Sequence, residues 1–185
     1  MNKNEIKSKM TKKKLYKSYM DLFRKKDISK ITIKEITGNA GYNRGTFYLY
    51  FKDVYDINDK IKKELILEAH DNLQKIADTN ISFERLFKTI VTFYTKNESS
   101  LLPFITKDSS FSSEIKQLLK PTLCKILKKD LNNKYVDYLI EYHITSVFGV
   151  VNFWVLNGKN ISVDELFNLL QQIITKGVFT VIKDL

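Results

Sequence analysis

Residues 31–53 read ITIKEITGNAGYNRGTFYLYFKD, and this stretch decides the fold. Thr32 and Glu35 have the spacing of a capping box, in which each side chain accepts a hydrogen bond from the other residue's backbone N–H at the start of a helix. Gly41 supplies the positive φ that a tight turn requires. The stretch therefore predicts a short helix that begins at Thr32 and ends in a turn at Gly41.

A second short helix follows this turn. Asn43 is a residue type favoured at helix N-caps, and the predicted helix runs from Arg44 to about residue 50. Phe47 and Phe51 fall on its inner face, because residues four apart lie on one side of a helix. Two helices around a tight turn are typical of the helix-turn-helix, whose second helix inserts its N-terminal residues into the major groove of DNA.

Positive charge is concentrated around this pair of helices. Residues 1–53 contain fourteen Lys or Arg and five acidic residues, whereas residues 54–185 carry a net charge of only +1. Such asymmetry favours a polyanionic partner, since Lys and Arg that neutralise phosphates supply most of the non-specific affinity for DNA. On charge alone, an anionic membrane surface or a solvated face remains an alternative. The basic arm of residues 3–14 either reaches DNA or is a solvated terminus.

The sequences Ile31–Ile36 and Ala40–Asp53 closely resemble the DNA-binding signature of the TetR family of bacterial repressors. The resemblance covers about residues 10–58. It implies a homodimer that binds a palindromic operator in double-stranded DNA, with an effector pocket in the C-terminal core. In one departure, the fourth helix of the family usually starts with a lysine that meets phosphate, whereas this chain has Val54 and offers Lys52 as the candidate substitute.

Two kinds of DNA contact are expected. Arg44 can donate two hydrogen bonds to the O6 and N7 atoms of guanine, and Gly45 lets the backbone approach the groove. At positions where the family contacts phosphate, hydroxyl and ammonium groups would position the domain without reading sequence. Tyr48 and Tyr50 have the alternative role of closing the small helical core. The predicted DNA-binding residues are Thr32, Asn43, Arg44, Gly45, Thr46, Tyr48, Leu49, Tyr50 and Lys52.

The remainder of the chain also predicts helices, because apolar residues recur every three or four positions and the chain has only six Gly and two Pro. The expected fold is all-α, with a helix-turn-helix DNA-binding domain of residues 1–53 and a helical effector-binding and dimerisation domain of residues 54–185. The last two helices are the most apolar and are the expected homodimer interface. Besides the two short helices, helices are predicted at about residues 11–26, 55–77, 82–97, 101–106, 112–129, 133–157 and 162–182.

Aromatic residues are frequent in the C-terminal half and are the candidates for an effector pocket. Aromatic residues at helical spacing usually form core, but some of them can line a cavity for a small apolar or aromatic effector. His143 and Trp154 each bring a polar donor into an apolar stretch, and His143 has the alternative role of a core histidine. The predicted effector-binding residues are Phe93, Phe104, Tyr142, His143 and Trp154.

No catalytic, metal or cofactor site is expected. Two histidines and one cysteine are too few for a Cys/His metal cluster, and the sequence has no phosphate-binding Gly-rich loop or nucleophile motif. A lone Cys124 excludes an intramolecular disulfide, and no secretory signal is recognised after Met1. The apolar run Val147–Leu156 is too short to cross a membrane. We therefore expect a cytoplasmic protein that is not an enzyme.

Two other functions stay open at this point. The C-terminal helices could chiefly bind another protein, with DNA binding that is vestigial or architectural. A small helical enzyme or a lipid-binding protein is the third reading, which would require turnover or membrane partition. Sequence-specific DNA binding separates the regulator from both.

Overall fold

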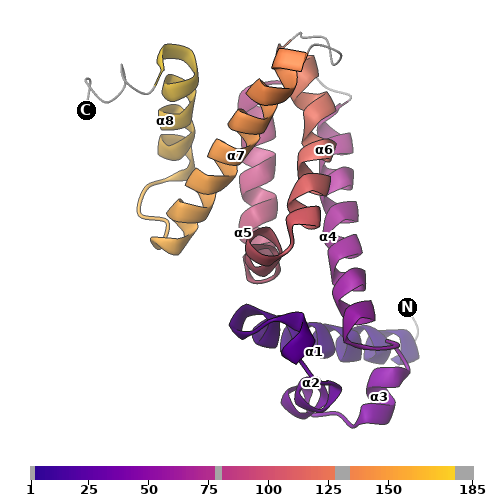
Figure 1. Cartoon of the computed structure of the whole chain (residues 1–185). Coiled ribbons are helices and arrows are strands. Elements are labelled where there is room, and N and C mark those ends of the chain that lie inside the picture. Colours follow the sequence, from indigo (N-terminus) through magenta and orange to yellow (C-terminus); the bar gives the residue numbers. More distant parts are fainter. Residues whose placement is uncertain (1–2, 78–80, 128–133, 178–185) are drawn as a thin grey trace. The chain divides into compact units, whose positions relative to one another are not determined.

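The described residues, 3–77, 81–127 and 134–177 of a computed structural model, form helices and no strand (Figure 1). The all-α prediction is therefore confirmed. In chain order the helices are α1 Lys3–Lys25, α2 Ile33–Ala40, α3 Arg44–Tyr48, α4 Val54–Ala77, α5 Phe83–Lys107, α6 Ser109–Leu127, α7 Lys134–Leu156 and α8 Val163–Lys176, with a 3-10 turn at Ile28–Lys30.

Several predicted helix limits differ from the structure. α1 begins at Lys3 rather than near residue 11, since no Gly or Pro interrupts the intervening residues. The predicted break between residues 97 and 101 is wrong, because α5 continues through it. Asn97 Nδ2 donates to the Phe93 carbonyl one turn earlier at 3.1 Å.

α6 begins at Ser109 rather than near residue 112. α8 ends at Lys176, where Gly177 is the C-cap with a φ of 84°, so the predicted continuation of this helix is wrong at residue 177. The predicted helix residues 128–129, 133 and 178–182 lie outside the described residues.

The chain divides into two units. Unit 1 comprises residues 1–68 and 99–111, and unit 2 comprises residues 69–98 and 112–185. Helices α4, α5 and α6 each supply residues to both units. The proposed DNA-binding domain, residues 1–53, lies within unit 1.

The core of unit 1 holds the two short helices in place. Ser18 Oγ of α1 donates to the Ile36 carbonyl of α2 at 2.8 Å. Phe47 of α3 and Phe51 after it are both buried, with their ring centroids 5.3 Å apart. The inward positions that the sequence predicts for Phe47 and Phe51 are therefore confirmed, and the opposite face of α3 is left to solvent.

The end of α5 also belongs to unit 1. Phe104 is fully buried, and its ring centroid lies 5.5 Å from that of Phe23 in α1 and 5.2 Å from that of Phe111 in α6. Lys107 Nζ donates to the backbone carbonyls of Phe23 at 2.6 Å and Arg24 at 3.2 Å. A cation is favourable there, because the last carbonyls of a helix have no partner within it. The end of α5 is thereby fixed to the end of α1.

Unit 2 is tied together by hydrogen bonds from its larger side chains. The hydroxyl of buried Tyr94 in α5 donates to Asn152 Oδ1 of α7 at 2.8 Å, and burial raises the pKa of Tyr94 to about 12. Trp154 Nε1 donates to the Ile161 carbonyl at 2.8 Å and fixes the loop that leads into α8. Both bonds satisfy polar groups that would be costly to bury alone.

Over Tyr135–Leu156, α7 has the length and apolar composition of a membrane-spanning helix. Its side chains Ile140, Ile144 and Val151 are buried within the chain, and core helices of soluble proteins meet the same criteria. The length and composition of this one helix are therefore weak support for a membrane span.

Candidate nucleic-acid interface and effector cavity

α2 begins at the capping box that the sequence predicts. The Glu35 N–H donates to Thr32 Oγ1 at 3.3 Å, and the Thr32 N–H donates to Glu35 Oε2 at 3.0 Å. Lys26 Nζ donates to Oε1 of the same carboxylate at 2.6 Å. The hydrogen bond from Lys26, together with those from Thr32, lowers the pKa of Glu35 to about 2. An ionised Glu35 thus connects the segment after α1 to the start of α2.

Two glycines shape the path into α3. Gly41 ends α2 with a φ of 73°, in the left-handed region that favours glycine. Asn43 then caps α3, with its Oδ1 accepting from the Thr46 N–H at 2.8 Å. A Cβ at Gly45 would lie 3.3 Å from this Oδ1, so the absence of a side chain leaves room for the cap. Gly45 therefore has a structural role besides the expected close approach to DNA.

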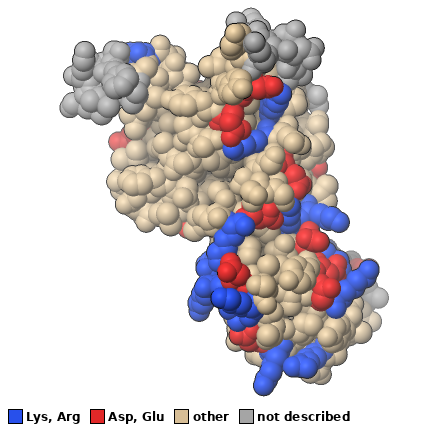
Figure 2. Space-filling view, in the orientation of Figure 1, with Lys and Arg blue, Asp and Glu red and all other residues tan. Residues whose placement is uncertain are grey.

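The outer face of α3 is exposed. Tyr48 is 58% exposed and Leu49, directly after the helix, is 78% exposed. Arg44 is also exposed and has no hydrogen-bond or ion-pair partner among the described residues. Figure 2 shows Lys and Arg side chains projecting around the part of the chain that holds α1 to α3. An exposed arginine, tyrosine and leucine on one short, capped helix suit a partner that is anionic and presents base edges.

Two of the predicted phosphate contacts have their hydroxyl protons engaged elsewhere. Thr32 Oγ1 donates to Glu35 Oε2 at 2.9 Å, and Thr46 Oγ1 donates to Asn43 Oδ1 at 3.0 Å. A hydroxyl has one proton to donate. In this arrangement Thr32 and Thr46 stabilise helix starts, and a phosphate there would be bound by backbone N–H groups of the first helical turn.

The link between α3 and α4 is held by Lys60. Its Nζ donates to the Tyr50 carbonyl at 2.8 Å and to Asp56 Oδ2 at 2.9 Å. The Lys52 N–H donates to the same Asp56 oxygen at 2.9 Å, and this bond and the one from Lys60 lower the pKa of Asp56. Val54 is buried, whereas the Lys52 side chain is exposed. The exposed Lys52 side chain is thus accessible to a partner, whereas buried Val54 is not.

Two lysines of the basic arm lie over aromatic rings near these residues, a contact that the sequence does not predict. Lys12 Nζ lies 5.8 Å from the centroid of the Tyr50 ring, and Lys14 Nζ lies 5.8 Å from that of Tyr42. Both lysines come from α1, where the predicted first helix and the end of the basic arm of residues 3–14 overlap. No local signal in the sequence indicates these contacts, because Tyr50 and Tyr42 lie far from the two lysines along the chain.

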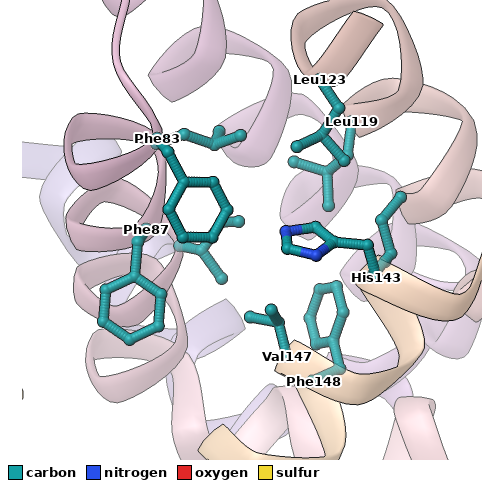
Figure 3. Close-up of a pocket in the computed structure, with 10 residues that line it drawn as sticks. Phe83, Phe87, Leu119, Leu123, His143, Val147 and Phe148 are labelled. Carbon is teal, nitrogen blue, oxygen red and sulfur yellow. The ribbon is translucent and has the colours of Figure 1, made fainter. Parts of the chain in front are cut away.

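Unit 2 contains a small cavity among α5, α6 and α7. It measures about 20 Å³, and Figure 3 shows the His143 imidazole pointing into it between Phe83, Leu119 and Phe148. The His143 and Phe83 ring centroids are 5.0 Å apart. Every other side chain that lines the cavity is apolar, and burial lowers the pKa of His143. A second cavity, of about 30 Å³, is lined by Phe93 and also by Phe148.

The predicted effector residues are not brought together as one set. Phe93 and His143 line neighbouring cavities, whereas Phe104 packs in the core of unit 1. Tyr142 is exposed on the outer face of α7, because it is one position before His143 and points away from the cavity. Trp154 is buried and bonded to the Ile161 carbonyl. These three side chains line none of the cavities described here in unit 2.

The match to a known family lies mainly in unit 2. The model of the C-terminal region of TetR-type transcriptional regulators matches residues 82–176, just over half of the chain. The chain belongs to the TetR family. No curated protein matches it by sequence, and across the described residues no group of three or more His, Cys, Asp or Glu is placed to hold a metal ion.

Solved structures of TetR-type regulators share the fold along nearly the whole chain. A proposed fatty acid metabolism regulator of Clostridium perfringens has a TM-score of 0.73 at 15% identity, covering 89% of this chain and 98% of its own. A TetR regulator of Streptococcus agalactiae has a TM-score of 0.63 at 18% identity, covering 92% and 97%. FadR of Bacillus subtilis, solved with stearoyl-CoA, has a TM-score of 0.63 at 16% identity, covering 89% and 98%.

Proposed function

We propose that this TetR-family regulator binds a palindromic operator as a homodimer, that residues 1–53 read the DNA, and that an apolar effector bound by residues 54–185 releases it. The observation that carries the DNA contact is the exposed face of α3. Arg44, Tyr48 and Leu49 face solvent from a helix whose other face is anchored by buried Phe47. Arg44 reads guanine, Leu49 contacts an apolar base edge, and Tyr48 meets phosphate or base.

The homodimer forms through α7 and α8. Along α7 the exposed large side chains include Tyr138, Tyr142 and Phe153, which are 76%, 67% and 68% exposed in the single chain. They recur at helical spacing on one face, and no charged residue replaces them there. Apolar area of this kind on a helix marks a protein interface, and a two-fold axis would pair the face with its own copy.

The effector shifts an equilibrium between two forms of the regulator. It can do so only by binding one form more tightly than the other. α5 and α6 line the cavities of unit 2 and continue into residues 99–111 of unit 1, where Lys107 is bonded to the end of α1. This continuity supports a route by which a change around the cavity alters how α3 is presented. The regulator acts in the cytoplasm by binding and not by catalysis.

The proposed function is tested by selecting binding sites for the purified full-length protein from random duplex DNA. The expected result is enrichment of a palindrome whose two half-sites lie about one helical turn apart, occupied by one dimer. Footprinting of DNA upstream of the gene then locates the natural operator. Retention of duplexes without any common sequence would contradict the proposal and favour the protein-interaction alternative.

A further inference from the structure

Unit 2 contains one groove and two cavities that adjoin one another in series. A groove of about 340 Å³ runs between the last turns of α4 and α6, and it shares Leu73 and Leu118 with the cavity of about 30 Å³. That cavity shares Ile90, Leu119 and Phe148 with the cavity of about 20 Å³ that His143 lines. Two thin walls of apolar side chains therefore separate a groove from two inner cavities.

The groove is the polar end of this series. Exposed His70 and Gln74 of α4 line it opposite exposed Gln117 and Lys125 of α6. Pro121 also lines the groove and has no N–H to donate to the Gln117 carbonyl, so one acceptor of α6 is left without its usual helical partner. Solvent and charged groups can thus meet at this end, whereas the lining of the inner cavities carries no Lys, Arg, Asp or Glu.

Lys125 provides the cationic group of the groove. Its Nζ donates to the Ala77 carbonyl at 3.0 Å, which holds the ammonium at the end of α4. An ammonium has three protons, so two remain for a ligand. His70 already lies 3.8 Å from the Asp71 carboxylate, whereas Lys125 has no acidic partner among the described side chains. An anionic group of a ligand therefore finds its favourable contact at Lys125.

The small volume of the two inner cavities restricts the shape of a ligand that can enter them. Each has room for about one or two water molecules, so an effector must displace the side chains between them. Rotation of Leu118, Leu119 and Phe148 would open a narrow path without separating the helices, and side chains change rotamer far more readily than packed helices move apart. A thin, flexible chain fits such a path, whereas a fused-ring molecule does not.

We propose that the effector is a long-chain acyl amphiphile whose anionic head lies in the α4–α6 groove at Lys125 and whose chain passes Leu118, Leu119 and Phe148 toward His143. The proposal rests on the effector response proposed above and adds the class and direction of the ligand. The acyl chain buries its methylene groups against apolar walls, which removes apolar surface from water. A free fatty acid and an acyl-CoA thioester share this chemistry.

Equilibrium dialysis of the full-length protein against labelled palmitate, palmitoyl-CoA and hexadecanol, below their micelle concentrations, tests the proposal. Palmitate or palmitoyl-CoA should bind to the protein, and the bound ligand should be displaced by the other two long-chain ligands but not by cholate, a bulky steroid carboxylate. Whichever of palmitate and palmitoyl-CoA binds more tightly shows whether the effector is the free acid or the thioester. Absence of binding by both, with operator binding intact, overturns the acyl proposal and leaves the DNA-binding function standing.

Two variants test the direction of the chain. Lys125→Ala should weaken binding of the anionic amphiphile about fivefold, leave hexadecanol binding unchanged and be rescued by Lys125→Arg. Lys116→Ala is the matched control in the same helix, since Lys116 pairs with Glu141 away from the groove. Leu119→Trp should weaken the binding of all three long-chain ligands at least about tenfold, because the larger side chain fills the path between the cavities. Equal loss of anionic and neutral ligands in Lys125→Ala, or unaltered binding in a folded Leu119→Trp, overturns the proposed arrangement.

Discussion

Helices α3 and α7 both expose large side chains to solvent, and they do so in different surroundings. At α3, Tyr48 and the following Leu49 lie beside Arg44, which has no partner in the described parts of the chain, and this region is the most basic of the sequence. On α7, Tyr142 and Phe153 belong to an exposed face without charge. The exposure of large side chains alone does not indicate which kind of partner a surface binds. The charge beside the exposed aromatic side chains distinguishes a surface for a polyanion from a surface for another apolar helix.

The largest effect is expected from placing a charge on the apolar face of α7. Phe153→Glu puts two carboxylates near each other and away from water in a two-fold interface. The dissociation constant of the dimer should rise at least about a hundredfold, and operator binding should weaken with it. Sedimentation equilibrium measures the first quantity, and operator titration measures the second.

Leu67→Glu is the matched control for this substitution, since Leu67 is a large apolar residue that is 61% exposed on α4. It should leave the dimer intact. A monomeric Leu67→Glu, or a Phe153→Glu protein that stays dimeric, would place the interface elsewhere.

A smaller effect is expected on the exposed face of α3. Leu49→Ala removes an apolar side chain that contributes little to the folded chain but can contact a thymine methyl group. Operator affinity should fall about fivefold to tenfold, the cost of one lost base contact of roughly 1 kcal/mol, with unchanged thermal stability. If Leu49→Ala lowers the melting temperature and spares operator binding, Leu49 serves the fold and not DNA.

A still smaller effect is expected from breaking the hydrogen bonds that join the end of α5 to the end of α1. Lys107→Met removes the ammonium that bonds to the Phe23 and Arg24 carbonyls. The free energy of unfolding should fall by about 1 kcal/mol, measured by circular dichroism in urea. Operator release by the effector should become less complete. Lys107→Arg keeps the charge and should behave as wild type, and a fully responsive Lys107→Met would exclude this link from the signalling route.

The smallest effect is a pH dependence from His143. Burial lowers its pKa below the ordinary value of 6.5, so the folded chain binds fewer protons than the unfolded chain at mildly acidic pH. Its contribution to stability is complete above pH 6.5 and is lost as the pH falls through the lowered pKa. His143→Phe should remove this part of the decline in urea midpoint between pH 7.5 and 5.5. An identical decline in His143→Phe would show that other groups cause it.

Local signals made the DNA-binding part predictable. The helix start at Thr32 follows from a capping box, and this box is present in the structure. The inward side chains Phe47 and Phe51 follow from spacing on a short helix. Each of these predictions depends on residues within four positions of one another, where the geometry of a helix leaves few alternatives.

Long-range packing set the limit of prediction elsewhere. Phe104 and Phe93 both lie on α5, yet one packs in unit 1 and the other lines a cavity in unit 2. Nothing near Phe104 in sequence indicates its contact with Phe23, which lies far away along the chain. Nor does the sequence indicate that the Thr46 hydroxyl donates a hydrogen bond to Asn43, since that bond depends on the rotamer of Thr46 at the helix cap.

The central claim, that α3 reads DNA sequence through Arg44, is tested most directly by salt-dependent binding of wild type and Arg44→Ala to the selected operator and to a scrambled duplex of equal length. Wild type should prefer the operator at least about a hundredfold. Arg44→Ala should lose most of this preference while keeping weak binding that falls steeply with salt, because its phosphate contacts are intact. An Arg44→Ala protein that discriminates as well as wild type would contradict the account.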